Sequence, residues 1–568
     1  MNAPKPAVGE VKLDDLLDLE IAFDWFDATK EKLSQADVLS GLLDHGLFAE
    51  KVPPCFSTEG LTAIVTEAMG SLIDEIDENT LKDNIDKCSH DYVRYEALRD
   101  INIPRHLGIP HPEAYAVQAQ AISKHWQEIA THCNQPNPAI SRIYVRHVGN
   151  GLIFEMNYRG VERFQLEEDE IRWMAGSKFV VEADIAACFP SIYTHSIPWA
   201  LYGKAESKKN TSITKSAGNL LDKCTRNTRD KQTNGLLIGP HASNIVSEIV
   251  LTRIDTALQA GGYEKVIRHV DDYRFFADTF EEAELFVKAL GLKLREYEMS
   301  LNEKKTRILE LPRPSEENWR LVLNRFLFPR NEELRFSVIR SFLDLALECA
   351  QALGKSTPLN YAIKTIAGGD EPRKLNPRAK RMYAQEAMNL ALAYPYLAPL
   401  LDEFVFDMCW NDGLKPRIAD FATSLVKLGV RKLYPDSIAH ALYFALKHDL
   451  ALDLKDEALI EIVALDDCVT NVLLLEYAKR HKRAKVKSAI TTRAKSLMTE
   501  DLREKDKHWL LIYHVWSKKQ LEGNAQGFLA KLKGKGFEFF CMHAKAAIKV
   551  GYPVADAVPE QPAAANAV

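Results

Sequence analysis

The chain has 568 residues, too many for one hydrophobic core, which predicts two or three domains. It is 46% hydrophobic with a net charge of −6, so it is no polycation, and any nucleic-acid contact must come from locally concentrated Lys and Arg. Nine scattered cysteines without a CxxC pair argue against a disulfide framework or zinc site. No signal peptide or apolar run of ~20 residues is visible, so a cytoplasmic protein without a membrane span is expected.

The composition and the apolar pattern of the sequence change along the chain. The first 90 residues alternate acidic, leucine-bearing helical stretches with a Pro-Pro break. In residues 91–330, β-branched and aromatic runs are punctuated by Gly and Pro, and RIYVRHVGNGLIFEMNY (142–158) reads as strands of an antiparallel sheet. From about 336 to 548, short helices with apolar residues at three- and four-residue spacing predict a stack of helical hairpins.

A carboxylate ends one of the strands expected within this mixed region. KFVVEADIAACF (178–189) predicts a buried strand that ends at Asp184. A turn then leads to a helix expected to open at Pro190, because proline suits the first helical turn, where its missing N–H is not needed.

Two further carboxylates follow 87 residues later. In VIRHVDDYRFFAD (266–278), strand-like runs flank Asp271 and Asp272, which predicts a strand–turn–strand. A double aspartate in a turn is commonplace and by itself indicates no function. If this hairpin lies beside the strand that ends at Asp184, the three carboxylates need cations to stay ionised. Two divalent ions ~4 Å apart are the usual solution, and they serve phosphoryl transfer.

Four motifs, in this order, resemble the palm of reverse transcriptases. ADIAACFPSIY resembles the first motif, and RHVDDYRFF resembles the double-Asp hairpin. Between them, QTNGLLIGPHASNIVSEIVLTRID (232–255) resembles the loop and helix in which Gly239 allows close approach to template base and nucleotide. LNEKKT resembles the fourth motif, with Lys305 as its lysine. RYEALRDINIPRHLGIPHPEAY (94–115) resembles the fingers segment, and NRFLF (324–328) loosely resembles the next hairpin.

The resemblance implies an α+β fold, in which the fingers and palm of a right-hand polymerase precede an all-α, HEAT-like helical-repeat domain. SIYTHSIPWALYGK and GLLIGP are similar to bacterial abortive-infection and other defence-associated reverse transcriptases, although Ile238 stands where retroviral-type and intron-type enzymes commonly carry Gln. The expected domains are an N-terminal helical extension (1–50), fingers and palm (51–330), helical repeats in place of a thumb (331–550) and a disordered tail (551–568).

The same resemblance implies a metal and substrate site. Asp184, Asp271 and Asp272 would bind two Mg²⁺ ions, which Mn²⁺ can replace, and the Ile185 carbonyl would be an additional ligand. Phe189 falls where the family has its steric gate, so its ring would exclude a ribose 2′-OH and select deoxynucleotides. A core aromatic residue at a helix start is the alternative interpretation.

Three basic residues complete the expected site. Arg142 and Arg146 alternate on one strand face and suit a triphosphate, although a solvated strand face explains them equally well. Lys305 suits protonation of the leaving pyrophosphate, with an ordinary surface lysine as the alternative.

Basic residues are also concentrated in two stretches outside these motifs. Residues 202–235 hold eight Lys and Arg against three acids, and residues 479–495 hold eight and no acid. Charge runs are usually solvated helix faces, but the local excess favours contact with a phosphate backbone.

The sequence therefore predicts a nucleotidyltransferase of reverse-transcriptase fold that incorporates dNTPs. The resemblance extends this to antiphage defence, by template-independent and protein-primed synthesis of DNA. One alternative is a templated enzyme that copies an associated noncoding RNA. Another is a non-catalytic protein that senses or sequesters a phage component, against which the three retained carboxylates argue. A homo-oligomer is also expected.

Overall fold

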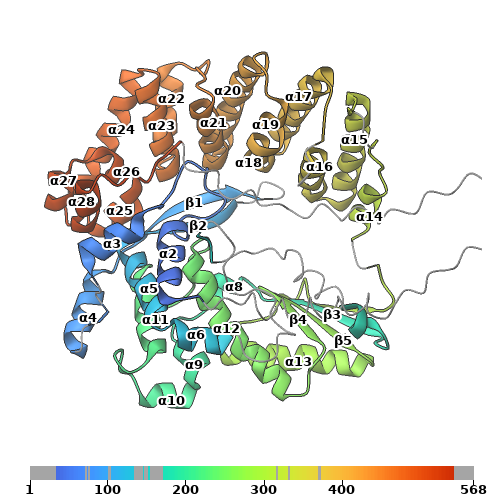
Figure 1. The fold of residues 1–568 in the computed structure, drawn as a ribbon, viewed down its shortest axis with the longest axis vertical. Helices are drawn as coiled ribbons and strands as arrows, with labels where there is room; N and C mark the ends of the chain where they lie inside the picture. The colour runs from blue at the N-terminus through green and yellow to red at the C-terminus, as the bar shows by residue number, and fades with distance from the viewer. Residues whose placement is uncertain are drawn as a thin grey trace, which may run out of the picture.

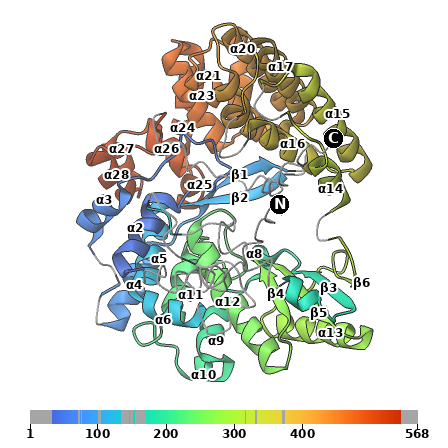
Figure 2. The ribbon, with the colours of Figure 1, turned by 45° about the vertical axis from the view of Figure 1, so that its right-hand side comes forward.

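A computed structural model describes residues 33–70, 73–74, 77–99, 104–133, 145, 151–153, 170–314, 317–329, 333–368 and 373–542. The blue and green part of the chain holds two small antiparallel sheets with their helices (Figure 1). The described yellow-to-red part is helical and forms an arc that returns to the N-terminal elements (Figures 1 and 2).

A four-stranded sheet carries the carboxylate motifs. Its strand order is β4-β5-β3-β6, with every neighbouring pair antiparallel. The strands are β3 (Phe179–Asp184), β4 (Val266–His269), β5 (Asp272–Ala277) and β6 (Arg307–Glu310). The two runs read as strands around Asp184 and Asp271–Asp272 are therefore strands, and they are neighbours.

The two faces of this sheet pack into different cores. On one face, Phe275 stacks on Phe286 of helix α13 (Phe280–Glu296), with ring centroids 4.3 Å apart. On the other face, Val180, Ile267 and Phe276 form a separate small cluster with neighbours such as Trp173. Burial on both faces explains why these strands are rich in β-branched and aromatic residues.

Helices between β3 and β4 lead to the long helix α12 (His241–Ala260). Pro240 is its N-cap, and Ile245, Ile249 and Ile254 are among its buried residues. The helix expected to open at Pro190 instead begins at Cys188, because Ala187 adopts a left-handed φ of 45° that ends the extended chain. The elements are α8 (Cys188–Ser191), α9 (Ser196–Tyr202), α10 (Lys204–Lys209) and α11 (Ala217–Asn227).

The N-terminal elements pack around a two-stranded hairpin. Its strands β1 (Tyr92–Leu98) and β2 (Pro104–Pro110) pair antiparallel, and Gly108 N–H donates to the Ile238 carbonyl at 3.0 Å. This bond joins the hairpin to the loop before α12. The surrounding helices are α2 (Gln35–His45), α3 (Leu61–Met69), α4 (Glu78–Lys87), α5 (Pro112–Lys124) and α6 (Trp126–Cys133).

After β6 the described chain is a succession of helices, which the apolar spacing predicts. NRFLF is not a hairpin, because α14 (Asn318–Asn324) ends at its first residue. The rings of Phe326 and Phe328 pack on the ring of Phe342 in the next helix, with centroids 5.0 and 4.9 Å apart. No described helix is long and apolar enough to cross a membrane. The main helices are α15 (Phe336–Leu353), α16 (Thr357–Ala367), α17 (Pro377–Ala393), α18 (Ala398–Leu401), α19 (Asp407–Cys409), α20 (Leu414–Lys432), α21 (Pro435–Lys447), α22 (Asp456–Val463), α23 (Cys468–Arg480), α24 (Ala484–Ser496), α25 (Leu502–Lys507), α26 (Trp509–Val515), α27 (Lys518–Gly523) and α28 (Gly527–Gly534).

The last helices are joined to the start of the described chain. Phe56 and Phe540 form an antiparallel bridge, flanked by a hydrogen bond from Ser57 N–H to the Phe539 carbonyl (2.9 Å). Farther along, the Tyr95 hydroxyl of β1 donates to Asp436 of α21 at 2.5 Å. The helical arc is thus fixed at both ends, by β6 and α14 in sequence and by these contacts in space.

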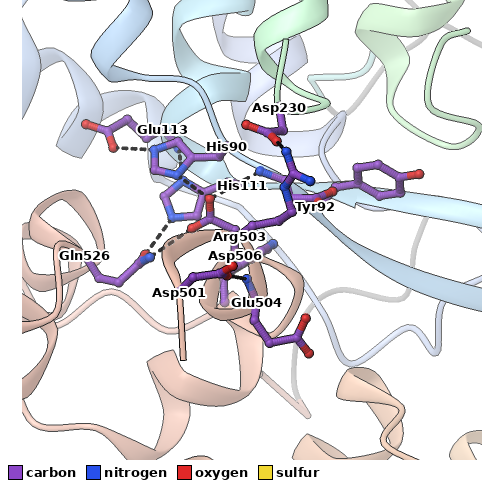
Figure 3. A network of polar contacts seen from close by, with 12 residues as sticks. His90, Tyr92, His111, Glu113, Asp230, Asp501, Arg503, Glu504, Asp506 and Gln526 are labelled. Carbon is purple, nitrogen blue, oxygen red and sulfur yellow. Dashed lines mark hydrogen bonds and ion pairs between the residues drawn. The ribbon is translucent and has the colours of Figure 1, made fainter. Parts of the chain in front are cut away.

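A buried polar network also joins the N-terminal elements to the helical arc (Figure 3). His90 lies between two carboxylates, with Nδ1 3.0 Å from Asp506 of α25 and Nε2 2.9 Å from Glu113 of α5. Burial opposes a charge on this ring, but the hydrogen bonds to Asp506 and Glu113 raise the pKa of His90 to about 9. The imidazolium therefore links the N-terminal helices to the helical arc through two charge-assisted hydrogen bonds.

Candidate active site

Strands β3 and β5 bring three carboxylates to one end of the sheet. Asp184 is the last residue of β3, and its direct cross-strand partner is Asp272, the first residue of β5. Asp271 precedes it in the turn, and its carbonyl accepts the Ile185 N–H at 3.1 Å. The strand pairing thus produces the convergence that the sequence predicts.

The turn between β4 and β5 contains only Val270 and Asp271. Val270 has φ of 56°, in the left-handed region that β-branched residues rarely enter. A non-glycine residue held there costs on the order of 1–3 kcal/mol, so the surrounding structure must compensate.

The carboxylates of this turn resist ionisation. Partial desolvation raises the pKa of Asp271, and repulsion from Asp184 adds to the effect. Partial desolvation and the neighbouring charges of Asp271 and Asp184 raise the pKa of Asp272 to about 6. Like charges held together in this way indicate a site that a cation would stabilise.

Asp184 is held by residues of the segment between α13 and β6. The Asn302 side-chain amide donates to Oδ1 at 2.8 Å, and the Lys305 ammonium lies 2.6 Å from Oδ2. The structure therefore places the predicted Lys305 at the carboxylate cluster, and it adds Asn302, which sequence reasoning missed. Its position three residues before Lys305 in LNEKKT is the signal that could have indicated it.

The donor set fits divalent cations with oxygen ligands. Three carboxylates converge here, and oxygen ligands of this kind suit Mg²⁺ or Mn²⁺. Among the described residues, these three carboxylates are not one of the groups whose ligand atoms all lie within 4.8 Å of one another. Ile185 follows Asp184 directly, and the role of its carbonyl stays a prediction.

Two other groups of described residues bring potential metal-binding atoms to within 4.8 Å of one another: His90, His111 and Asp506, and Asp466, Glu504 and His508. The rings of His90 and His111 are stacked, 3.8 Å apart and inclined by 17°. A metal ion lies in the plane of each imidazole that binds it, so these nearly parallel rings cannot share one. The members of both groups form hydrogen bonds or ion pairs with one another or with neighbouring side chains.

The loop before α12 lies beside the helix that follows Asp184. Leu236 N–H donates to the Phe189 carbonyl at 2.8 Å, and Phe189 is half-buried. Gly239 has φ of 127°, and a Cβ placed on it would lie 2.6 Å from the Ala49 side chain. The glycine at this position therefore already has a structural explanation, which is its left-handed backbone and its contact with Ala49.

A cavity of about 370 Å³ lies between the β1–β2 hairpin and this loop. Tyr92, Arg94 and Arg229 give it an aromatic and basic wall, and both guanidinium groups lie 5.9 Å from the Tyr92 ring. Sequence reasoning did not single out these three residues, because the hairpin and Arg229 are far apart in the chain. The cavity is lined by Tyr92, Arg94, Glu96, His106, Leu107, Gly108, Pro190, Arg229, Leu236, Leu237 and Ile238.

The remaining predicted basic residues have different outcomes. Arg142, Arg146 and the strands expected at 142–158 lie outside the described residues. Within 479–495, five of the eight Lys and Arg form ion pairs with acids on their own helix, on a neighbouring helix or between helices. Arg493, for example, makes a bidentate pair with Asp466, with both distances 2.8 Å. These pairs favour the alternative interpretation, in which the basic run is a solvated helix face whose charges are paired with nearby acids.

Several basic residues of the other stretch, 202–235, also contact neighbouring groups of the protein. In 202–235, Lys223 pairs with Asp86 at 2.7 Å, and Lys204 lies 4.2 Å from the centre of the Trp199 ring. Arg229 donates to the carbonyls of Asn234 and Gly235. The three carboxylates and the cavity therefore carry the case for a functional site.

Comparison with known proteins finds a family match over the part of the chain that contains these carboxylates. Residues 127–343, which are 217 of the 568 residues, match the sequence profile of the family described as "Reverse transcriptase (RNA-dependent DNA polymerase)". This part of the chain, which contains the four-stranded sheet, is similar to reverse transcriptases. The match begins at residue 127, so the proposed fingers segment at 94–115 lies outside it.

No curated protein sequence matches the chain. Among solved structures, an apo telomerase from Candida tropicalis aligns with a TM-score of 0.28 and 9% sequence identity, covering 74% of this chain and 68% of the telomerase chain. A score this low supports no argument about fold or function.

Proposed function

We propose that this protein is a DNA polymerase of the reverse-transcriptase type that joins deoxynucleotides by a two-metal mechanism. The observation that carries the proposal is the pairing of Asp184 with Asp272 across β3 and β5, with Asp271 beside them. This arrangement lies within the segment similar to reverse transcriptases. The raised pKa values of Asp271 and Asp272 support it, because such carboxylates bind cations in preference to staying charged alone.

Each residue of the site has a role in the proposed reaction. Asp184, Asp271 and Asp272 would hold two divalent cations, Mg²⁺ or Mn²⁺, which supply the positive charge that activates an attacking hydroxyl and neutralises the leaving pyrophosphate. Lys305 stands at the same cluster and would give a proton to the pyrophosphate oxygen. Asn302 keeps the Asp184 carboxylate oriented through its 2.8 Å hydrogen bond.

The incoming nucleotide is placed beside Phe189. The backbone of Phe189 is bonded to the loop that lines the cavity with Tyr92, Arg94 and Arg229. An aromatic ring and two guanidinium groups suit a base and phosphates. The half-buried Phe189 ring would then exclude the 2′-OH of a ribonucleotide.

The resemblance of SIYTHSIPWALYGK and GLLIGP to defence-associated enzymes extends the proposal. On this basis the protein acts in antiphage defence and synthesises DNA without a template, primed by one of its own hydroxyl groups. The helices from 331 onward would be HEAT-like repeats that take the place of a thumb. These points rest on sequence resemblance alone.

The test is incubation of the purified chain with labelled dNTPs and Mg²⁺, without template or primer. Label that migrates with the protein and is lost on protease treatment supports protein-primed synthesis. Synthesis that depends on a co-purified RNA assigns a templated reaction instead. If wild-type protein incorporates no label with either Mg²⁺ or Mn²⁺, with or without added template and primer, the polymerase proposal is wrong.

A further inference from the structure

Arg268 lies in β4, two residues before the strained Val270, and its side chain is completely buried. Its guanidinium donates from every N–H group it has. Nε and Nη2 bond Asp255 at 2.8–3.2 Å, Nη1 and Nη2 bond Glu248 at 3.1 and 2.6 Å, and Nη1 also bonds the Val270 carbonyl at 3.0 Å. A guanidinium with all five donors used in a dry site is fixed in position.

Both acidic partners belong to α12. Glu248 and Asp255 are seven residues apart, which is two helical turns, so they lie on the same face of the helix. The Tyr273 hydroxyl, from the residue after Asp272, donates to Asp255 at 2.8 Å. The network therefore holds the chain immediately before Asp271 and immediately after Asp272, and it anchors both points to α12.

Stability alone does not explain this network. Two carboxylates and a guanidinium must be desolvated here, and apolar residues of similar volume often give an equally stable core. An apolar replacement could not donate to the Val270 carbonyl. This bond fixes a β-branched residue at φ of 56°, and the conformation of Val270 determines where Asp271 and Asp272 lie.

We infer that Arg268 is a positioning residue, which uses its buried contacts with Glu248 and Asp255 to hold the Val270–Asp271 turn so that Asp271 and Asp272 bind metal ions together. The inference rests on the proposed function, because it takes the two aspartates as metal ligands. It adds a residue that touches neither metal nor nucleotide. Because α12 begins at His241, two residues after Gly239, the same helix also carries the loop that lines the cavity, so loop and turn are held in a fixed relation.

Arg268→Lys is the informative variant. A lysine keeps the positive charge between Glu248 and Asp255, but a single ammonium group cannot also reproduce the bond to Val270 and the bidentate contacts. Arg274→Lys is the matched control, because Arg274 lies in the same hairpin and its ion pair with Glu170 is partly exposed. Circular dichroism and thermal melting establish that each variant is folded.

The first measurement needs no activity. Hydrogen exchange in the metal-free protein, read by mass spectrometry on a peptide covering 266–277, should become faster in Arg268→Lys and stay unchanged in Arg274→Lys. The second is Mn²⁺ binding followed by electron paramagnetic resonance. The half-saturating Mn²⁺ concentration should rise roughly tenfold in Arg268→Lys, the usual size of an effect on residues that orient metal ligands.

A purely structural role predicts something different. Loss of folded protein would lower the amount of bound Mn²⁺ at every concentration and leave the half-saturating concentration unchanged. Wild-type exchange at 266–277 together with wild-type Mn²⁺ affinity in Arg268→Lys overturns the inference. An unchanged half-saturating Mn²⁺ concentration in Arg268→Lys, together with a smaller amount of bound Mn²⁺, also overturns it.

A rescue experiment tests the reason for the effect. Adding Val270→Gly to Arg268→Lys should restore part of the Mn²⁺ affinity, since glycine adopts positive φ without strain. If Arg268→Lys does not fold, Tyr273→Phe, which removes only the bond to Asp255, should raise exchange in the same peptide, and its failure to do so overturns the inference.

These outcomes separate the inference from the proposed function. A wild-type protein that protects the turn but synthesises nothing contradicts the polymerase proposal and leaves the exchange result valid. A wild-type protein that synthesises DNA, with Arg268→Lys equal to it in exchange and Mn²⁺ affinity, contradicts only the inference.

Discussion

The Lys305 ammonium lies 2.6 Å from one carboxylate oxygen of Asp184, while Asn302 bonds the other. Lys305 is therefore a cation that the chain itself supplies to the carboxylate cluster. It is also more than half exposed, which leaves it able to contact a substrate.

Lys305→Met should lower nucleotide incorporation by about a hundredfold, because a positioned proton donor typically contributes at least that factor. The measurement is the initial rate of labelled dNTP incorporation at saturating Mg²⁺. Lys304→Met is the control, since Lys304 is exposed and adjacent in the sequence. Equal rates for the two variants would mean that Lys305 is an ordinary surface lysine.

Asp271→Ala and Asp272→Ala should each abolish synthesis, with a loss on the order of a thousandfold or more, because several kcal/mol of charge stabilisation depends on the metal ligands. Neither variant should melt at a lower temperature, since each removes one of the mutually repelling carboxylates. Asp278→Ala, at the far end of β5 and paired with Lys265, should retain activity. Normal polymerisation by either of the first two variants would show that the metal assignment is wrong.

Phe189→Ala should admit ribonucleotides. Removing the ring opens the space that a 2′-OH would occupy, so the ratio of kcat/KM for dNTP over rNTP should fall by at least about tenfold. Phe189→Tyr keeps the bulk of the ring and should preserve the ratio. The measurement compares incorporation of labelled dGTP and GTP by wild type and both variants. An unchanged ratio in Phe189→Ala would make Phe189 a core residue and nothing more.

His90 predicts how stability depends on pH. Its pKa is about 9 in the folded protein, against about 6.5 in the unfolded chain. The stabilisation is therefore complete below pH 6.5 and is lost as pH rises through 9, an effect on the order of 2–4 kcal/mol. His111, stacked on it, has its pKa held well below the usual range by burial and by the charge of His90, so it stays neutral throughout.

The melting temperature of the wild type should consequently fall between pH 6.5 and 9.5. His90→Gln should melt lower than the wild type at pH 6.5, and the difference should narrow as pH rises. His106→Gln, at an exposed position of β2, is the control and should follow the wild type. A constant difference across this range would show that His90 is not charged in the folded protein.

Much of the site could be predicted from the sequence, because local pattern controls it. The apolar and aromatic runs that end at Asp184 and follow Asp272 predict two strands, whereas the pairing of these strands stayed a condition until the structure showed it. Pro240 marks the start of α12 for an equally local reason.

What could not be predicted depends on contacts between distant parts of the chain. The bridge between Phe56 and Phe540 joins residues 484 positions apart, and no periodicity encodes it. The ion pairs of the basic run at 479–495 could not be predicted, because four of its five acidic partners, such as Asp466, lie more than twenty residues before the base that they pair with. Glu248 and Asp255 offered a clearer signal, as acids seven residues apart on the buried face of α12.

The attachment of β1 to the helical arc has a consequence for how accurately the proposed polymerase would select nucleotides. Tyr95 is bonded to Asp436 and the nearby His90 to Asp506, so the hairpin cannot swing over a bound nucleotide unless these buried bonds break. Closure driven by the correct substrate is one means by which polymerases reject a wrong one. Under the proposed function, a polymerase whose hairpin stays bonded in this way is expected to have low fidelity, and to insert whichever base its cavity holds best.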